Sequence, residues 1–201
     1  MKAKSELTLF AILLCMIAGS CVKEKLETIY KKQETQIDSY LSSNNTAKRD
    51  STIVAEDGST RDTTWTDTLD IIYNKGAARL VKKEGSGPAL SETGAVSFYY
   101  AGYIFKGNNV SAANLFATNH QQTAESSNFS LTDPDYSLLE VNMAETDLLE
   151  GLRNGLIGVR AGEECEILFN AKYGYGNKTF GIIPVNSALL YKIWVVGVSN
   201  D

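Results

Sequence analysis

The stretch AKYGYGNKTFGIIPVNSALLYKIWVV, residues 171–196, decides the fold. Two tyrosines alternate with glycines, and a short polar loop leads through Gly181–Pro184 into an apolar alternating run. The alternation over Leu189–Val195 is typical of a strand with one buried face. The bulky side chains before it lie on a glycine-rich loop, where an exposed apolar cluster indicates a binding site. The alternative is that Tyr173 and Tyr175 only pack this loop against the sheet.

Strands also dominate the sequence before this stretch. Apolar residues alternate over VSFYYAGYI, residues 96–104, and over ECEILFN, residues 164–170. An earlier strand, residues 78–83, is followed by a turn at Gly85–Pro88. Cys165 belongs to an alternating apolar set, and reactive thiols need an accessible, electropositive setting. We therefore expect the Cys165 thiol to be buried and inert.

One helix interrupts the strands. Thr146 can cap it, and Asp147 and Glu150 favour the positive first turn. Its apolar residues form one stripe, which consists of Leu148, Leu149, Leu152 and Leu156. Because one helix can cover only one face of a sheet, the sequence predicts an α+β fold in which an antiparallel sheet wraps around one short α-helix.

A polar segment, residues 117–137, precedes that helix. It is rich in Ser, Thr, Asn and Gln, and we expect a surface loop inserted between elements. His120 lies there without a cysteine or a second histidine nearby. Asp133, Asp135 and Glu140 lack the glycine and the terminal glutamate of a calcium-binding loop. The sequence therefore predicts no metal site and no cofactor.

Composition limits the class of protein. The 201 residues, of which 43% are hydrophobic, suggest one ordinary domain with extensions. The net charge of −5 offers no basic surface, so we expect no nucleic-acid partner. The density of apolar residues rises near residue 70, and we assign residues 70–201 to the main domain.

The first twenty residues are organised like an export signal. Met1–Lys4 is basic, and the apolar run Leu7–Ala18 is too short to span a bilayer as a mature helix. The small residues before Cys21 resemble a bacterial lipoprotein signal, with residues 1–20 removed and Cys21 lipidated. Ordinary secretion and an uncleaved anchor are the alternatives. With Cys21 lipidated, Cys165 is left alone and no intrachain disulfide can form.

Residues 21–69 read as a lipid-anchored tether. Apolar residues recur among charged ones at helical spacing, which predicts an amphipathic helix that ends at Ser42–Asn45. Its apolar positions are Leu26, Ile29, Tyr30, Ile37, Tyr40 and Leu41. This helix can act as a spacer, pack on the domain or dimerise. Thr52–Ala55 and Thr63–Trp65 flank a turn at Asp57–Gly58, which suggests a short hairpin.

In their order, the segments between about residue 78 and residue 198 resemble an FKBP-type peptidyl-prolyl cis-trans isomerase domain. Each motif alone is weak, because glycines and apolar alternation are common, but their order and spacing together are specific. The motifs are VSFYYAG (96–102) with Leu115–Phe116, LLEGLRNGL (148–156), VRAGE (159–163), YGYG (173–176) and IIPVNSALLY (182–191).

This resemblance implies a pocket that holds a proline ring between the sheet and the helix. It assigns Tyr100 and Phe116 to the pocket aromatics and Tyr175 to the tyrosine whose hydroxyl donates to a ligand carbonyl. We expect these three residues to be catalytic, with the Leu149 backbone N–H as a second donor. The substrate-binding residues that it implies are Leu139, Val141, Leu148, Leu149, Leu152, Ile182, Ile183 and Tyr191.

Three positions depart from the family pattern. Ala117 replaces the usual aspartate after the matching phenylalanine, Leu152 replaces a frequent tryptophan on the pocket floor, and Leu139 stands where an aromatic is usual. A polar contact is lost and the pocket becomes looser. These departures leave a second function open, that of a non-catalytic, peptide-binding or chaperone-like lipoprotein.

The first expectation is a peptidyl-prolyl cis-trans isomerase that assists the folding of exported proteins. Its partners would be proline-containing polypeptides, whose uncatalysed isomerisation is slow enough to limit folding. A lipid anchor would hold it to a membrane of the bacterial cell envelope. Val22–Lys25 is mixed in charge and not acidic, so we favour the periplasmic face over the cell surface.

Overall fold

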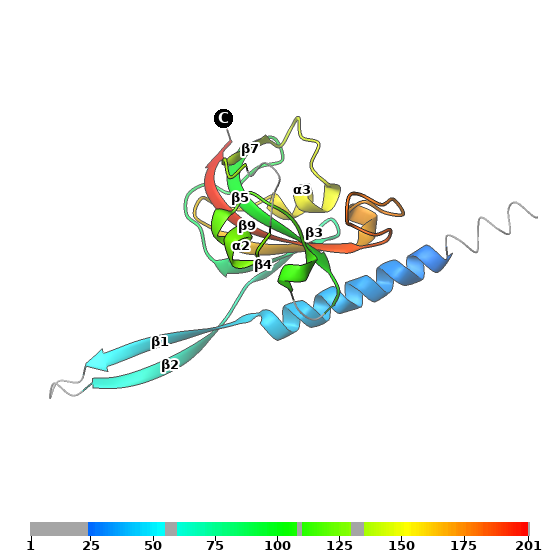
Figure 1. The fold of residues 1–201 in the computed structure, drawn as a ribbon. Coiled ribbons are helices and arrows are strands. Elements are labelled where there is room, and N and C mark those ends of the chain that lie inside the picture. The colour runs from blue at the N-terminus through cyan, green and yellow to red at the C-terminus, as the bar shows by residue number, and fades with distance from the viewer. Residues whose placement is uncertain (1–23, 55–59, 108–109, 130–134, 201) are drawn as a thin grey trace, which may run out of the picture.

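The computed structural model of the protein describes residues 24–54, 60–107, 110–129 and 135–200 (Figure 1). The predicted lipidation site, Cys21, and the predicted turn at Asp57–Gly58 lie outside these residues. The helices are α1 (24–44), α2 (Gln121–Ser126) and α3 (Glu150–Leu156). The strands are β1 (Thr46–Val54), β2 (Thr60–Thr68), β3 (Ile71–Asn74), β4 (Ala77–Lys83), β5 (Ala95–Phe105), β6 (Leu115–Thr118), β7 (Leu139–Asn142), β8 (Glu164–Phe169) and β9 (Ala188–Ser199).

Strands β3 to β9 form one antiparallel sheet with the order β3-β4-β8-β9-β5-β6. The last strand, β9, therefore lies between β8 and β5 near the middle of the sheet. The first residues of β5 pair with β7, and later residues of the same strand pair with β6. The segment that connects β6 to β7 thus leaves and rejoins the sheet along one edge of β5.

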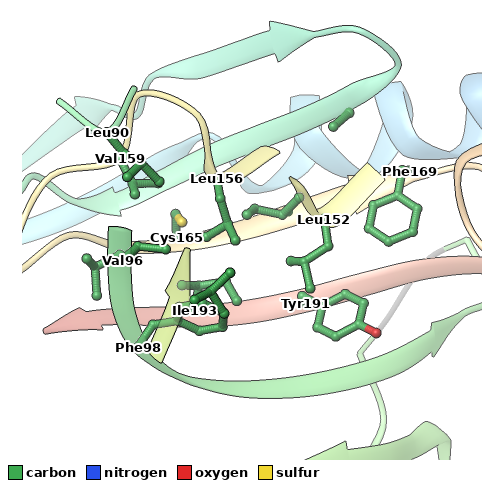
Figure 2. Close-up of a cluster of buried hydrophobic side chains, with 14 of the residues drawn as sticks. Leu90, Val96, Phe98, Leu152, Leu156, Val159, Cys165, Phe169, Tyr191 and Ile193 are labelled. Atoms are coloured by element: carbon green, nitrogen blue, oxygen red, sulfur yellow. The ribbon is translucent and has the colours of Figure 1, made fainter. Parts of the chain in front are cut away.

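Helix α3 covers one face of this sheet, as the sequence predicts. Leu152 and Leu156 lie among buried residues of β5, β8 and β9, including Phe98, Cys165 and Ile193 (Figure 2). Gly151 and Gly155 of the LLEGLRNGL motif lie one helical turn apart, on the side of α3 that meets β8. A Cβ at these positions would collide with Phe169 and Ile167, respectively. Glycine therefore allows the helix to approach the sheet this closely.

Helix α1 packs on the opposite face of the sheet (Figure 1). Ile37, Tyr40 and Leu41 are buried there against residues of several strands, such as Leu168 and Leu190. The Tyr40 hydroxyl donates a hydrogen bond of 2.9 Å to Glu166, and burial together with this carboxylate raises the tyrosine pKa. Of the three roles open from the sequence, the structure shows the helix packed on the domain.

The predicted hairpin is formed by β1 and β2, which pair in register from Thr46 opposite Thr68 to Val54 opposite Thr60. It projects away from the sheet and its covering helices (Figure 1). It is longer than the sequence pattern suggests.

Two expectations about local structure are wrong. Helix α3 begins at Glu150, not directly after Thr146, because the backbone of Leu149 is not helical and the Thr146 hydroxyl instead accepts a hydrogen bond from the Leu148 N–H. The segment 117–137 is not only a loop, since it contains the end of β6 and helix α2. Among the described residues, no helix is long and apolar enough to cross a membrane, and no cluster of acidic, histidine or cysteine side chains could hold a metal ion.

Candidate functional site

A cavity of about 670 Å³ lies between the sheet, the start of α3 and the loop before β9. Its lining is mainly aromatic and aliphatic, and all but one of the catalytic and substrate-binding residues predicted from the sequence lie in it. These are Tyr100, Phe116, Leu139, Leu148, Leu149, Leu152, Tyr175, Ile182, Ile183 and Tyr191. Residues from elements far apart in the chain thus meet around one recess.

Val141 is the exception, and its assignment to the pocket is wrong. Leu139 lies opposite Phe98 in the pairing of β7 with β5, and both residues line the cavity. Val141 lies two residues further along, opposite Val96, and is buried in the hydrophobic core. Strand β7 therefore brings Leu139 to the cavity, whereas Val141 lies beyond the end of the cavity.

Tyr191 of β9 is the centre of the aromatic wall. Its ring lies edge-on to Phe116 with centroids 5.7 Å apart, and its other neighbours include Tyr100 at 6.2 Å. The Phe116 ring lies over Gly102 of β5, where a Cβ would come within 2.6 Å of the Phe116 Cζ atom. Glycine at 102 therefore lets the Phe116 ring reach Tyr191 across the strand.

The loop before β9 divides its apolar residues between the cavity and its rim. Phe180 and Ile183 exchange two backbone hydrogen bonds of 3.1 and 2.8 Å, which closes a tight turn at Gly181–Ile182. Ile183 is consequently buried, whereas Ile182 is 65% exposed at the rim. The rings of Tyr175 and Phe180 stack with centroids 4.4 Å apart. The bulky side chains of this glycine-rich loop therefore line the cavity, while the glycines allow the tight turns that bring them there.

The three tyrosines of the cavity stay protonated at neutral pH. Burial is the main cause that raises the pKa of Tyr100, Tyr175 and Tyr191. Asp135 raises the pKa of Tyr100 further, and neighbouring tyrosine hydroxyls add to the shifts of Tyr175 and Tyr191. The hydroxyl groups can therefore act as hydrogen-bond donors to a carbonyl oxygen inside an apolar recess.

The model of the family described as FKBP-type peptidyl-prolyl cis-trans isomerase matches residues 90–196, more than half of the chain. The chain belongs to this FKBP family. The matched residues include all the strands, helices and loops that line the cavity. Helix α1 and the β1–β2 hairpin lie outside the match.

Two curated relatives of this FKBP-type chain differ in what their names state. FK506-binding protein 1 of Aspergillus oryzae is 27% identical over 124 residues, which are 62% of this chain and 99% of that protein. A human protein named inactive peptidyl-prolyl cis-trans isomerase FKBP6 is 28% identical over 128 residues, which are 62% of this chain and 33% of the human one.

Solved FKBP structures share the fold. The peptidyl-prolyl cis-trans isomerase of Pseudomonas syringae aligns with 87% of this chain and 96% of its own, with a TM-score of 0.50 and 15% identity. The three FKBP domains of wheat FKBP73 give a TM-score of 0.51 and 21% identity, over 68% of this chain and 52% of that one. At these identities the likeness shows the fold alone.

Several residues of this FKBP cavity were missed from the sequence. They are Phe98, Phe129, Asp147, Phe180 and Gly181. Phe98 alternates with Tyr100 along β5, and this spacing could have identified it. Phe129 follows α2 in the segment between β6 and β7, where no periodic pattern indicates which side chain turns inward.

Leu149, one of the residues that line this FKBP cavity, carries a backbone N–H that is unpaired among the described residues. Leu149 directly precedes α3 and lines the cavity. Within the described part of the chain, its N–H has no hydrogen-bond partner, whereas the N–H of Leu148 donates to Thr146 at 3.1 Å. This N–H is therefore available to donate a hydrogen bond to an acceptor oxygen.

Proposed function

We propose that this protein is a peptidyl-prolyl cis-trans isomerase that assists the folding of exported proteins. The single observation that carries the proposal is the convergence of Tyr100, Phe116, Tyr175 and Ile183 on one apolar recess that contains hydrogen-bond donors. A proline ring is apolar and compact, and the peptide bond before it has carbonyl groups on both sides that can accept hydrogen bonds.

The reaction needs no nucleophile. Resonance in the X-Pro amide gives a rotation barrier of roughly 18–20 kcal/mol, and the twisted transition state loses this resonance. A recess that removes water from the planar amide and binds the twisted one more tightly lowers the barrier. Tyr175 and the Leu149 N–H would donate to the carbonyls that flank the bond, while Phe116 and Tyr191 would enclose the ring.

The test is the cis-to-trans rate of a short peptide with an apolar residue before proline. We expect the full chain in mild detergent to accelerate the reaction. Tyr175→Phe should lower kcat/KM by about three- to tenfold, because one hydrogen bond is lost. Phe116→Ala should lower kcat/KM further, and the double variant should remove the acceleration.

Tyr99→Phe provides a matched control, because Tyr99 lies beside His120 and is not a cavity residue. It should leave the rate unchanged. Circular dichroism establishes that each variant is folded. An unaccelerated reaction with folded wild-type protein contradicts the isomerase assignment.

A second candidate function is peptide binding without efficient isomerisation. Ala117 favours it, because a methyl group lines the cavity where the family motif usually carries a carboxylate. Leu139 and Leu152 also line the cavity, at positions where the family motif more often carries aromatic residues. Calorimetric binding of the same peptide, combined with an unaccelerated isomerisation rate, would select this second function.

We also propose that Cys21 carries lipid and holds the protein to a membrane of the cell envelope, with the periplasmic face favoured. Two or more acyl chains give a stable anchor. Labelled palmitate should enter the wild-type protein expressed in bacteria and not the Cys21→Ala variant, which should also leave the membrane fraction. Equal labelling of both would contradict lipidation at Cys21.

A further inference from the structure

A closed ring of hydrogen bonds connects helix α1 to the loop of the cavity. The Gln33 side-chain carbonyl accepts from the Ala171 N–H at 2.9 Å, and its amide donates to the Asn186 carbonyl at 2.7 Å. The Asn186 N–H donates to the Gly176 carbonyl at 2.7 Å, and the Gly176 N–H donates to the Ala171 carbonyl at 2.8 Å. Gln33 is the one side chain in this ring, which we call the Gln33 ring.

The Gln33 ring encloses both ends of the segment that supplies the outer cavity wall. Tyr175 precedes Gly176 directly, and Ile183 lies three residues before Asn186. Asn186 has a positive φ of 55°, which is uncommon for a residue with a side chain. A backbone in this conformation needs support from its surroundings, and Gln33 supplies it by bonding the Asn186 carbonyl.

Gln33 is buried, as a residue that supports the loop from inside the protein should be. It is 9% exposed although it is a polar residue on a helix that otherwise buries apolar side chains. The neighbouring Glu34 accepts a hydrogen bond of 2.8 Å from Asn170, directly before Ala171. Buried polar groups that are fully paired impose one specific arrangement on their partners.

We propose that Gln33 is a positioning residue of the cavity, through which α1 holds the Tyr175 and Ile183 walls in the geometry that binds peptide. The inference rests on the proposed function for its effect on peptide. Its structural part, the ordering of residues 171–186 by a helix outside the FKBP match, does not depend on activity.

The main test compares two variants of the full chain that each remove hydrogen bonding between α1 and the domain. Gln33→Leu removes both side-chain bonds of the Gln33 ring. Tyr40→Phe removes the buried bond to Glu166, which lies on the sheet face away from the cavity. Both variants disturb the docking of α1, but only the first acts on the loop.

Two readouts are measured for each variant. Amide hydrogen exchange at Ala171 and Asn186 should accelerate about tenfold or more in Gln33→Leu and stay unchanged in Tyr40→Phe. KM for the X-Pro peptide should rise about tenfold in Gln33→Leu with a smaller change in kcat, because the walls bind the ground state less well. Unchanged exchange, or equal effects of the two variants, would overturn the proposal.

Gln33→Glu keeps the experiment decisive if Gln33→Leu does not fold. A glutamate has nearly the same size and still accepts from Ala171, but it cannot donate to Asn186 when ionised. Exchange should then accelerate at Asn186 and remain slow at Ala171. If the wild-type protein neither binds nor isomerises the peptide, the proposed function has failed, while exchange still decides whether Gln33 orders the loop.

Discussion

Ala117 places a methyl group in the cavity wall next to Phe116, where the family motif usually provides an aspartate. A carboxylate there would restore a polar contact for the bound peptide. We expect Ala117→Asp to raise kcat/KM roughly tenfold, in line with one hydrogen bond to a charged group.

Ala117→Asn is the control for this substitution, because it has the size of aspartate without its charge. It should give a smaller gain in the same isomerisation assay. A lower rate in both variants would mean that the small side chain at 117 benefits this cavity.

The cavity residues show what a motif can and cannot specify. Tyr100, Phe116 and Tyr175 come together because each belongs to a motif whose backbone path is determined by strand pairing or by glycines, although their catalytic roles stay predictions. Val141 was misassigned because strand alternation places it on the cavity side of β7 without telling where the cavity ends. Phe129 could not be found, since the segment that carries it has no repeating pattern.

At the scale of elements, the contact between α3 and β8 depends on glycine. Alanine is the better helix former by up to about 1 kcal/mol, yet the added methyl group of Gly155→Ala would collide with Ile167. We expect a net loss of about 1–3 kcal/mol in the free energy of unfolding, measured with urea.

Ile167→Ala provides the matching variant for a double-mutant cycle, because it removes the atoms that the new methyl group meets. The double variant should be more stable than the sum of the two losses predicts. Strict additivity would contradict a direct clash between these side chains.

The start of α2 is packed on the sheet through His120, which stacks on Trp194 of β9 with ring centroids 3.9 Å apart. Burial lowers the pKa of His120, and Glu164 opposes this shift. The folded protein therefore binds fewer protons than the unfolded chain near the usual histidine pKa of about 6.5. The contribution of neutral His120 to stability is therefore fully present above this pH. It is lost as the pH falls through the lowered pKa of the folded protein.

We expect the thermal midpoint to fall more between pH 7.5 and pH 5 in the wild type than in His120→Phe, which keeps an aromatic ring on Trp194. Differential scanning calorimetry at both pH values measures this difference. An equal fall in the two proteins would show that His120 does not contribute to the pH dependence.

The sequence predicted the elements of the main sheet better than their neighbours. Alternation identified β5, β8 and β9 within a few residues, and the FKBP-like antiparallel sheet around a short helix is confirmed. The partner of α1 could not be predicted, because an amphipathic pattern defines an apolar face but not the surface that covers it. The start of α3 was misplaced because Thr146 caps a turn before the helix.

At the scale of the whole molecule, α1 covers a sheet face that the FKBP match alone would leave open. Ile37, Tyr40 and Leu41 are buried against it. A chain shortened to begin at residue 46 should lose on the order of 5 kcal/mol of stability, since each such side chain contributes about 1.5–3 kcal/mol. It should also aggregate, which light scattering measures.

A chain that begins at residue 31 keeps these three contacts and provides the control. Its urea midpoint should match that of the longer chain. A stable, monomeric chain without α1 would contradict the role of the helix as a cover for the sheet.

The central place of β9 in the sheet has a consequence for how the protein is made. Residues 188–199 must pair with β8 on one side and with β5, about ninety positions earlier in the chain, on the other. Such distant pairing is slow to form, because a long loop must close first. During synthesis the sheet therefore cannot close until β9 has emerged, and its unpaired strands stay exposed to aggregation until then. A protein proposed to help others fold would itself be among the late folders.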